Sequence, residues 1–284
     1  MMMKRLFTHS GICALLALGL SQTVFAQAKK ESLNPLATKT SNTVGVTVSG
    51  YQYLEPNVEP GVDVSLKATM VGIDYSGIYA FAKGWYARGD LRYAYGPAKY
   101  SGSGTQSNIP YYYGEARGLS GYDFNFSALG GFVLAPYMGL GYRYLFDNQG
   151  GQTSTGQYAY QRSSSYFYLP IGVTHRMMVN DTHRIETAIE YDYLIQGKQI
   201  TKLSQASSYL PNITNQQNQG YGLRFSSMYQ FEKWSVGPFV TYWNIGQSNT
   251  YNGTISAGRR TASFSAYEPA NNTIEAGLKV AYSF

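Results

Sequence analysis

The C-terminal segment, residues 273–284 (TIEAGLKVAYSF), alternates strictly between apolar side chains and polar or small ones. Successive side chains of a β-strand point to opposite faces, so this pattern predicts a strand with two different surroundings. One face suits lipid and the other suits a polar lumen, as in a transmembrane β-barrel. The apolar face comprises Ile274, Ala276, Leu278, Val280, Tyr282 and Phe284, and the opposite face comprises Glu275, Gly277, Lys279, Ala281 and Ser283.

The same segment resembles a known assembly signal. The spacing of Gly277, Val280, Tyr282 and Phe284 is similar to the C-terminal signal of Gram-negative outer-membrane β-barrels. In that signal a glycine is followed by alternating hydrophobic residues and a terminal Phe. The resemblance implies that the barrel-assembly machinery is a partner of the last strand.

The N-terminal segment predicts a cleaved secretory signal over residues 1–26. Lys4 and Arg5 precede an apolar run at residues 11–20, and small residues at 24–26 suit a signal peptidase. The run is too short to cross a bilayer as a helix, which needs about 20 residues. Cleavage after Ala28 and a choice among the three initial Met residues remain open.

Composition excludes several classes of protein. Cys13 is the only cysteine and lies in the predicted signal, so the mature chain is expected to have no disulfide and no thiolate metal site. The formal net charge of +6 is too mild to indicate nucleic acid as a partner. A mean hydropathy of −0.27, with 28 Tyr and 31 Gly, is compatible with a barrel. We expect no cofactor and no metal.

Alternation and turn residues predict an all-β fold, a transmembrane antiparallel up-and-down barrel of about ten strands, with eight or twelve still possible. Residues 27–42 are expected to form a flexible periplasmic leader, and residues 43–284 the barrel. The ninth strand does not separate into two clear faces. The predicted strands are residues 43–53, 62–78, 84–100, 111–126, 132–148, 160–178, 183–198, 219–232, 234–248 and 272–284.

The connections alternate between short and long. Short turns with both termini in the periplasm and long loops outside are typical of integral outer-membrane barrels, so we expect this location. Pro136, Pro170 and Pro238 fall inside predicted strands and imply a bulge or an edge. Short turns are predicted at 79–83, 127–131, 179–182 and 232–233, and long loops at 54–61, 101–110, 149–159, 199–218 and 250–271.

The inward face of the predicted strands carries charges of both signs. Buried charges are tolerated when they are paired, so we interpret them as a polar core and keep an ion path as the alternative. Hairpin register predicts Arg176 opposite Glu186, and Asp74 near Arg88. The predicted lumen network is Asp74, Arg88, Asp90, Arg92, Glu115, Arg117, Arg143, Arg176, Glu186, Glu190, Asp192, Arg224, Glu275 and Lys279, with Asp123 and Arg184 on the same face.

Aromatic residues gather toward the predicted strand ends. Girdles at the two membrane interfaces explain most of them, and a sugar-binding platform is the alternative. They include Tyr51, Tyr53, Trp85, Tyr100, Tyr111, Tyr112, Tyr113, Tyr166, Phe167, Tyr168, Tyr229, Phe231 and Trp234.

The titratable residues give little support for an enzyme. Outer-membrane barrels include omptin proteases and lipid A deacylases, which need catalytic histidines. After signal cleavage only His175 and His183 remain, and both flank the predicted turn at 179–182 on the periplasmic side. We interpret both as polar residues near a turn and expect no catalytic site.

The barrel as a whole resembles small outer-membrane β-barrels of the OmpA-like and opacity-protein type, through Tyr- and Gly-rich strands such as residues 135–146 (APYMGLGYRYLF). The resemblance implies architecture and location, because such barrels support many functions. Our first hypothesis is a closed, charge-paired barrel whose loops at 199–218 and 250–271 meet outer-membrane lipid, lipopolysaccharide or an unknown surface ligand. Arg259 and Arg260 could contact lipid phosphates. The alternative is a narrow porin-like channel for ions or small solutes.

Overall fold

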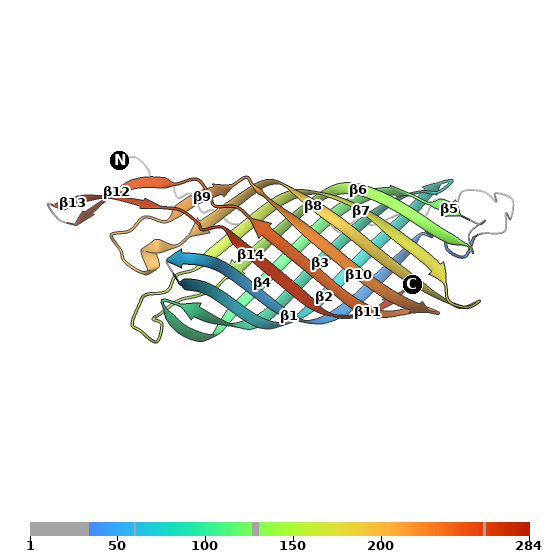
Figure 1. Cartoon of the computed structure of the whole chain (residues 1–284), viewed down its shortest axis with the longest axis horizontal. Coiled ribbons are helices and arrows are strands. Elements are labelled where there is room, and N and C mark those ends of the chain that lie inside the picture. Colours follow the sequence, from blue (N-terminus) through green and yellow to red (C-terminus); the bar gives the residue numbers. More distant parts are fainter. Residues whose placement is uncertain (1–33, 60, 127–130, 258–259) are drawn as a thin grey trace, which may run out of the picture. The chain divides into compact units, whose positions relative to one another are not determined.

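The computed structural model describes residues 34–59, 61–126, 131–257 and 260–284. These residues form one unit, Asn34–Phe284, in which strands wrap around a common axis (Figure 1). Within this described part, no helix is long and apolar enough to cross a membrane. The predicted signal peptide at 1–26 lies outside the described residues.

Ten long antiparallel strands form the wall among the described residues, as the alternation predicts. At the end of the barrel that has the short turns, each strand begins or ends within a few residues of the predicted position. Their bounds are β1 Ser41–Glu59, β2 Val62–Ala82, β3 Trp85–Gly102, β4 Gly104–Tyr122, β6 Phe132–Asp147, β7 Arg162–Met178, β8 His183–Thr201, β10 Gly220–Phe231, β11 Trp234–Ile245 and β14 Asn271–Ser283.

The wall closes on itself. Each of these strands pairs with its neighbour along the chain, and β14 then pairs with β1. Closure leaves no wall strand with a free edge, which satisfies the backbone hydrogen bonds without water. We call the end with the turns at 83–84 and 232–233 the turn end, and the opposite end the loop end.

Several predicted loops contain paired strands. The predictions of long loops at 54–61 and 101–110 are wrong, because β1 continues to Glu59 and β3 is followed almost at once by β4. The ladder hydrogen bonds continue beyond the apolar part of the wall, where the side-chain pattern no longer reveals them. Shorter strands are β5 Phe124–Phe126, β9 Ile213–Gln217, β12 Tyr251–Ala257 and β13 Arg260–Ala266.

The outer face of the wall is apolar over its middle. Exposed side chains such as Val71, Leu91 and Leu278 point outward, while their chain neighbours point into the barrel. β11 also has two distinct faces, with Phe239 and Trp243 buried inside. Three of its inward residues, Phe239, Trp243 and Ile245, are themselves large and apolar, which explains why its sequence shows no clear alternation.

Tyrosine and glycine pack against each other across neighbouring strands. Tyr168 lies opposite Gly141, and Tyr137 lies opposite Gly172. A Cβ atom at either glycine would stand within 2.5 Å of the tyrosine ring. Each ring therefore occupies the space that a larger side chain on the next strand would need, which accounts for part of the high Tyr and Gly content.

The three strand prolines behave differently from one another. β7 has a register shift between Phe167 and Tyr168, close to Pro170. Pro136 and Pro238 lie in ladders whose register is continuous around them. The prediction of a bulge or edge is therefore wrong at these two positions, because the neighbouring ladder bonds hold the register.

Residues 34–40 pack at the turn end of the barrel. Leu36 is buried with Tyr86 and Val133, and the backbone N–H and hydroxyl of Thr38 both donate to Asp123 at 2.5 and 2.8 Å. Within the flexible leader predicted for 27–42, residues 34–40 are thus anchored by one apolar side chain and one carboxylate, while residues 27–33 lie outside the described part of the chain. Ser41 and Asn42 already belong to β1.

Candidate functional site in the barrel lumen

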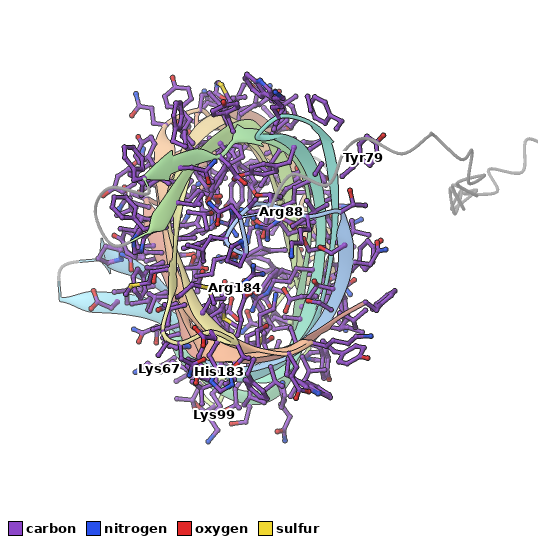
Figure 2. The ribbon with its side chains drawn as sticks, turned by 90° about the vertical axis from the view of Figure 1, so that its right-hand side faces the viewer. Lys67, Tyr79, Arg88, Lys99, His183 and Arg184 are labelled. Atoms are coloured by element: carbon purple, nitrogen blue, oxygen red, sulfur yellow. The ribbon has the colours of Figure 1, made fainter. Side chains whose placement is uncertain are left out.

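Two groups of inward side chains fill the middle of the lumen. The ion-pair layer comprises Asp74, Arg88, Asp90, Arg92, Glu115, Arg117, Glu190, Asp192, Arg224, Glu275 and Lys279. The aromatic layer lies nearer the loop end and comprises Tyr51, Tyr111, Tyr113, Tyr166, Tyr168 and Trp243. Viewed from the turn end, side chains fill much of the ring of strands, with Arg88 and Arg184 inside it (Figure 2).

Arg224 on β10 is the most heavily bonded cation of the ion-pair layer. Its guanidinium reaches Glu115 on β4 through Nη1 and Nη2, at 2.8 and 2.5 Å. Its Nε donates to Asp192 at 2.6 Å and lies 3.1 Å from Glu190. Because β4 and β10 lie on different sides of the barrel, the contact with Glu115 crosses the lumen.

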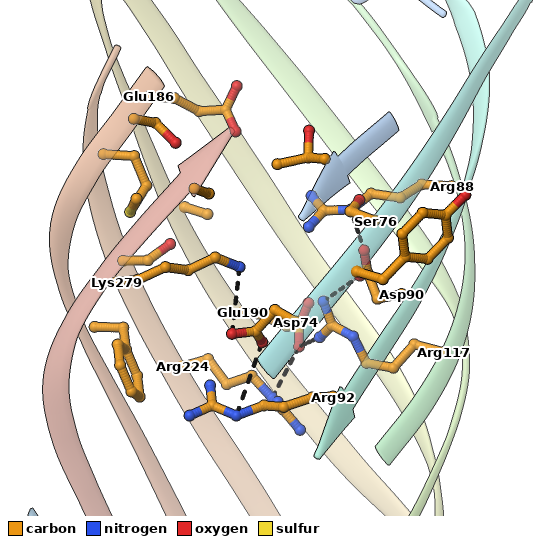
Figure 3. Close-up of a pocket in the computed structure, with 18 of the residues that line it drawn as sticks. Asp74, Ser76, Arg88, Asp90, Arg92, Arg117, Glu186, Glu190, Arg224 and Lys279 are labelled. Atoms are coloured by element: carbon orange, nitrogen blue, oxygen red, sulfur yellow. Dashed lines mark hydrogen bonds and ion pairs between the residues drawn. The ribbon is translucent and has the colours of Figure 1, made fainter. Parts of the chain in front are cut away.

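Arg117 makes a second bridge across the lumen. It donates to Glu190 on β8 at 2.5 Å and to Asp90 on the adjacent β3 at 2.7 Å. Arg88 donates to the other oxygen of Asp90, also at 2.7 Å. Figure 3 shows this chain of charges from Arg88 through Asp90 to Arg117.

Arg92 on β3 connects a third side of the lumen to β14. Its Nη2 donates to Glu275 at 2.8 Å, and its Nε lies 3.8 Å from Asp74. Lys279 is also 3.8 Å from Asp74. The predicted pairing of Asp74 with Arg88 is wrong, because Asp74 is in register with Arg92 whereas Arg88 is in register with Ile78.

A separate ion-pair group lies toward the turn end. Arg176 donates to Glu186 at 2.8 Å and to Asp123 at 3.1 Å. The register places Arg176 opposite Glu186, as the hairpin predicted. Asp123 also accepts from Thr38, so this group connects the wall to residues 34–40.

Arg143 differs from the other predicted lumen charges in its surroundings. It is only 3% exposed, and its guanidinium carbon lies 4.7 Å from the ring centroid of Tyr113 and 5.6 Å from that of Trp243. Cation–π contacts of this kind stabilise a desolvated guanidinium. Arg143 therefore belongs spatially to the aromatic layer.

The aromatic layer spans the lumen through ring contacts. Tyr51 and Tyr111 lie 5.1 Å apart between ring centroids, and their hydroxyls are 2.7 Å apart. On the other side, Tyr168 and Trp243 meet edge to face at 5.0 Å. The interpretation of Tyr51, Tyr111, Tyr113, Tyr166 and Tyr168 as interface girdles is wrong, because all five are buried inside the barrel.

The two layers are joined by tyrosine hydroxyls. Tyr168 donates to Glu115 at 2.7 Å, and Tyr113 donates to Glu275 at 2.5 Å. Each hydroxyl satisfies a carboxylate oxygen that faces the aromatic layer. The phenol rings thus form the boundary between an apolar region and a charged one.

A further charged cluster lies at the loop end and was not found from the sequence. Arg162 on β7 lies 2.9 Å from Glu55 and 3.6 Å from Glu268, which follows β13. Burial raises the pKa of Glu268 to about 7, with Arg162 opposing the shift and Glu55 adding to it. Glu268 falls in a predicted loop, where periodicity gives no signal for a buried carboxylate.

A polar cavity of about 250 Å³ lies between the ion-pair layer and the turn end. Its lining includes Arg88, Arg184, Glu186 and Lys279, with Arg224 at its inner side. It is large enough for several water molecules, and its walls offer donors and acceptors. Arg184 also donates to the backbone oxygen of Pro35, at 3.2 Å.

The two histidines lie near the turn end. His183 Nδ1 is 2.5 Å from the Tyr229 hydroxyl, and His175 packs against Phe132 with 5.5 Å between ring centroids. In the part of the chain that the structure describes, no three His, Cys, Asp or Glu side chains are grouped so that they could hold a metal ion.

Two further sets of residues were predicted from the sequence, the pair Arg259 and Arg260 and the C-terminal assembly signal. Arg259 lies outside the described residues, as does the side chain of Arg260. In the predicted assembly signal, Gly277 packs closely against β1, where a Cβ atom would stand 2.3 Å from the Val48 carbonyl oxygen. Val280, Tyr282 and Phe284 point away from the lumen, and their recognition by other proteins stays a prediction.

Neither the family models nor the curated protein sequences include a match to this chain. Among solved structures, the outer membrane protease OmpT from Escherichia coli matches with a TM-score of 0.53 and 9% identity, over 86% of this chain and 97% of that one. The β domain of the Bordetella autotransporter BrkA gives 0.39 at 16% identity, over 87% and 100%. Outer membrane protein OprG from Pseudomonas aeruginosa gives 0.38 at 12%, over 88% and 98%.

At these identities a likeness concerns architecture alone, and of the three only the OmpT score exceeds 0.5. The likeness of OmpT to this closed barrel supports the fold independently of the side-chain alternation in the sequence. The chain therefore has the fold of the ten-stranded β-barrels of Gram-negative outer membranes.

Proposed function

We propose that this protein is a closed outer-membrane barrel with a structural or surface-interaction role, with its turn end in the periplasm and its loop end outside the cell. The apolar outer face of the wall supports membrane insertion. At the turn end, β2–β3 and β10–β11 are joined by two residues each, whereas the loop end has the long segments at 202–219 and 246–270 and strands that continue beyond the apolar part of the wall. This asymmetry supports the orientation, because outer-membrane barrels have short periplasmic turns. This proposal assigns no catalytic residue.

The observation that carries the proposal is the double obstruction of the lumen. The ring contacts of the aromatic layer reach from β1 to β4 and from β7 to β11. The ion pairs below them reach from β10 to β4 and from β4 to β8. An ion entering from the loop end would have to displace buried rings and then separate paired charges, both of which cost free energy.

Conductance of the refolded, signal-free protein in planar bilayers tests this closure. The wild-type barrel should show no stable current steps. Tyr168→Ala combined with Trp243→Ala should produce steps, because it removes two rings from the centre of the aromatic layer and the hydroxyl that bonds to Glu115 and Arg224 in the ion-pair layer. Heat-modifiable migration on gels serves as the check that both proteins are folded. Stable wild-type steps that change in Arg143→Ala or Glu190→Ala would contradict the proposal.

The turn-end cavity favours a narrow channel as the second candidate function. It already forms a polar entrance that reaches Arg92, Arg117 and Arg224 from the turn end. Conduction would then require that the aromatic layer move and that the ion pairs below it separate. In that case Glu190 and the arginines would set ion preference, and the same bilayer recordings distinguish the two functions.

The loop end offers the surface for interaction. β12 and β13 form a two-stranded hairpin that extends from this end in Figure 1, and they pair from Tyr251 with Ala266 to Ala257 with Arg260. We expect the hairpin and the loop at 199–218 to meet surface partners or lipopolysaccharide. Replacing residues 250–267 by a short turn should leave a folded barrel and reduce binding of intact cells to their surface ligands. Unchanged binding by this variant would count against a role for the hairpin.

A further inference from the structure

Two lysines stand directly opposite each other on the outer face of the wall. Lys67 on β2 is in register with Lys99 on β3, and both side chains are exposed. Figure 2 shows both on the outer side of the strands. On the other neighbour, β1, the residue in register with Lys67 is Gln52, which is uncharged.

This arrangement places two positive charges directly opposite each other on adjacent strands. Like charges at directly opposed positions of adjacent strands destabilise the pair. Among the described residues, neither ammonium has a carboxylate within 4.0 Å. An anion between the two ammonium groups would remove the repulsion, and a phosphate group is small enough to contact both.

The lysine pair lies at the edge of the apolar part of the wall. Toward the turn end, the outward pairs on the same two strands become apolar, with Val71 opposite Tyr95 and Ile73 opposite Tyr93. Val71 is 61% exposed and Ile73 is 54% exposed, as expected for lipid-facing side chains. The two ammonium groups are therefore at the level at which lipid headgroups carry their phosphates.

An apolar groove lies further down the same flank. It has a volume of about 500 Å³ and is lined by Ile73, Leu91, Tyr93, Tyr142 and Tyr144, with Gly114 and Ala116 from β4. A Cβ atom at Gly114 would meet only the Arg92 carbonyl oxygen, at 3.9 Å, so the groove is open above this glycine.

The spacing of the two features fits one lipid molecule. From Lys67 to Ile73 the strand advances about 20 Å at 3.4 Å per residue. With a strand tilt of about 45°, this is about 14 Å of depth, close to one hydrocarbon leaflet, and about 14 Å sideways along the wall. A phosphate at the lysine pair and an acyl chain in the groove would thus belong to the same lipid.

We propose that the flank formed by β2, β3 and β4 binds a phosphorylated, acylated glycolipid of the lipid A type. The Lys67–Lys99 pair binds a phosphate of the headgroup, and the groove above Gly114 and Ala116 holds an acyl chain. The choice of a glycolipid over a phospholipid rests on the proposed orientation, in which the loop end lies at the outer leaflet. The barrel wall itself is the site, independent of the loops and of the lumen.

The test is a titration of the full refolded chain in detergent with purified lipid A, followed by native mass spectrometry. Lys67→Gln with Lys99→Gln should weaken lipid A binding at least about tenfold, because both ammonium groups that contact the phosphate are removed. Lys198→Gln is the matched control, because Lys198 is an exposed lysine on β8 whose register partners are Ser165 and Gln216. This control should bind lipid A as the wild type does.

A second pair of variants tests the groove separately from the charge. Gly114→Leu should fill the groove and weaken lipid A binding severalfold. Gly118→Leu is its control on the same strand, because a Cβ atom there also meets open space and Gly118 does not line the groove. Near-ultraviolet circular dichroism of all variants establishes that the barrel is intact.

Three results would overturn the inference. These are wild-type affinity of the double lysine variant, equal losses in Gly114→Leu and Gly118→Leu, or equal affinity of the wild type for phosphatidylglycerol and for lipid A. Surface proteolysis of the β12–β13 hairpin on intact cells tests the orientation independently. Cleavage there combined with any of the three results would refute the lipid site and leave the proposed orientation standing.

Discussion

The aromatic layer and the ion-pair layer occupy the same lumen but fill it with different kinds of side chain. The aromatic layer contains large rings, with Tyr168 and Trp243 at 0% and 2% exposure. The ion-pair layer contains guanidinium and carboxylate groups beside a cavity of about 250 Å³. Both use the inward positions of the same strands, so the alternation that builds the wall does not decide what fills it.

The two layers differ in whether water can hydrogen-bond to their polar groups. In the aromatic layer, packing excludes water, so a polar atom there can be satisfied only by another protein group. Among the described residues, Trp243 Nε1 and Arg143 Nε have no hydrogen-bond partner. In the ion-pair layer, several charges also face the cavity, where water can complete their hydrogen bonds. Tyr113 and Tyr168 connect the two layers. Each has its ring in the aromatic layer, and its hydroxyl donates a hydrogen bond to a carboxylate of the ion-pair layer.

The largest effect is expected from removing the central cation of the ion-pair layer. Arg224→Met should destabilise the barrel by about 3–5 kcal/mol, because it leaves Glu115 and Asp192 buried without their guanidinium. Unfolding by guanidinium chloride in lipid vesicles measures this loss. The loss should shrink at pH 3, where the orphaned carboxylates can take up protons. A loss that is independent of pH would show that packing dominates in this layer too.

A smaller loss is expected from the aromatic layer. Trp243→Leu should cost about 2–3 kcal/mol through lost ring contacts and a residual void. The same unfolding measurement applies, and here the loss should be equal at pH 3 and pH 7. A strong pH dependence would mean that Arg143, whose guanidinium faces Trp243, is held mainly by charge rather than by the rings.

The loop-end cluster of Arg162, Glu55 and Glu268 should make the stability of the barrel depend on pH, with a smaller effect than the two above. The pKa of Glu268 is raised from 4.5 to about 7, so its contribution to stability is fully present below pH 4.5 and is lost as the pH rises through 7. The wild-type barrel should therefore lose roughly 1–3 kcal/mol from this group between pH 4.5 and pH 8. Glu268→Gln should flatten this part of the pH profile, and an unchanged profile would exclude Glu268 as its origin.

The smallest effect is expected at the cavity surface. Arg88 has a side chain that is 29% exposed, and its ion pair is with Asp90, which also binds Arg117. Arg88→Gln should cost at most about 1 kcal/mol, because solvent screens the lost pair and Arg117 remains. A cost as large as that of Arg224→Met would erase the distinction between the cavity surface and the interior of the layer.

Several features of the fold followed from local pattern. The inward and outward faces of β14 could be assigned from residues 273–284 because a strand has a period of two. The pairing of Arg176 with Glu186 also followed, because a short turn between β7 and β8 leaves one register. Local information was insufficient for Asp74, because the turn between β2 and β3 carries a register shift between Ala80 and Ala82.

What the sequence alone determined is the wall: the ten long strands, the two faces of most of them and the inward position of the charges, all of which depend on neighbours along the chain. The tertiary structure decided which inward residues meet. The contact of Arg224 with Glu115 and the burial of Tyr51 against Tyr111 join strands on different sides of the barrel. Such contacts depend on closure, which brings together residues that no local period relates. Lys67 and Lys99 meet instead across the β2–β3 hairpin, whose register the shift between Ala80 and Ala82 decides.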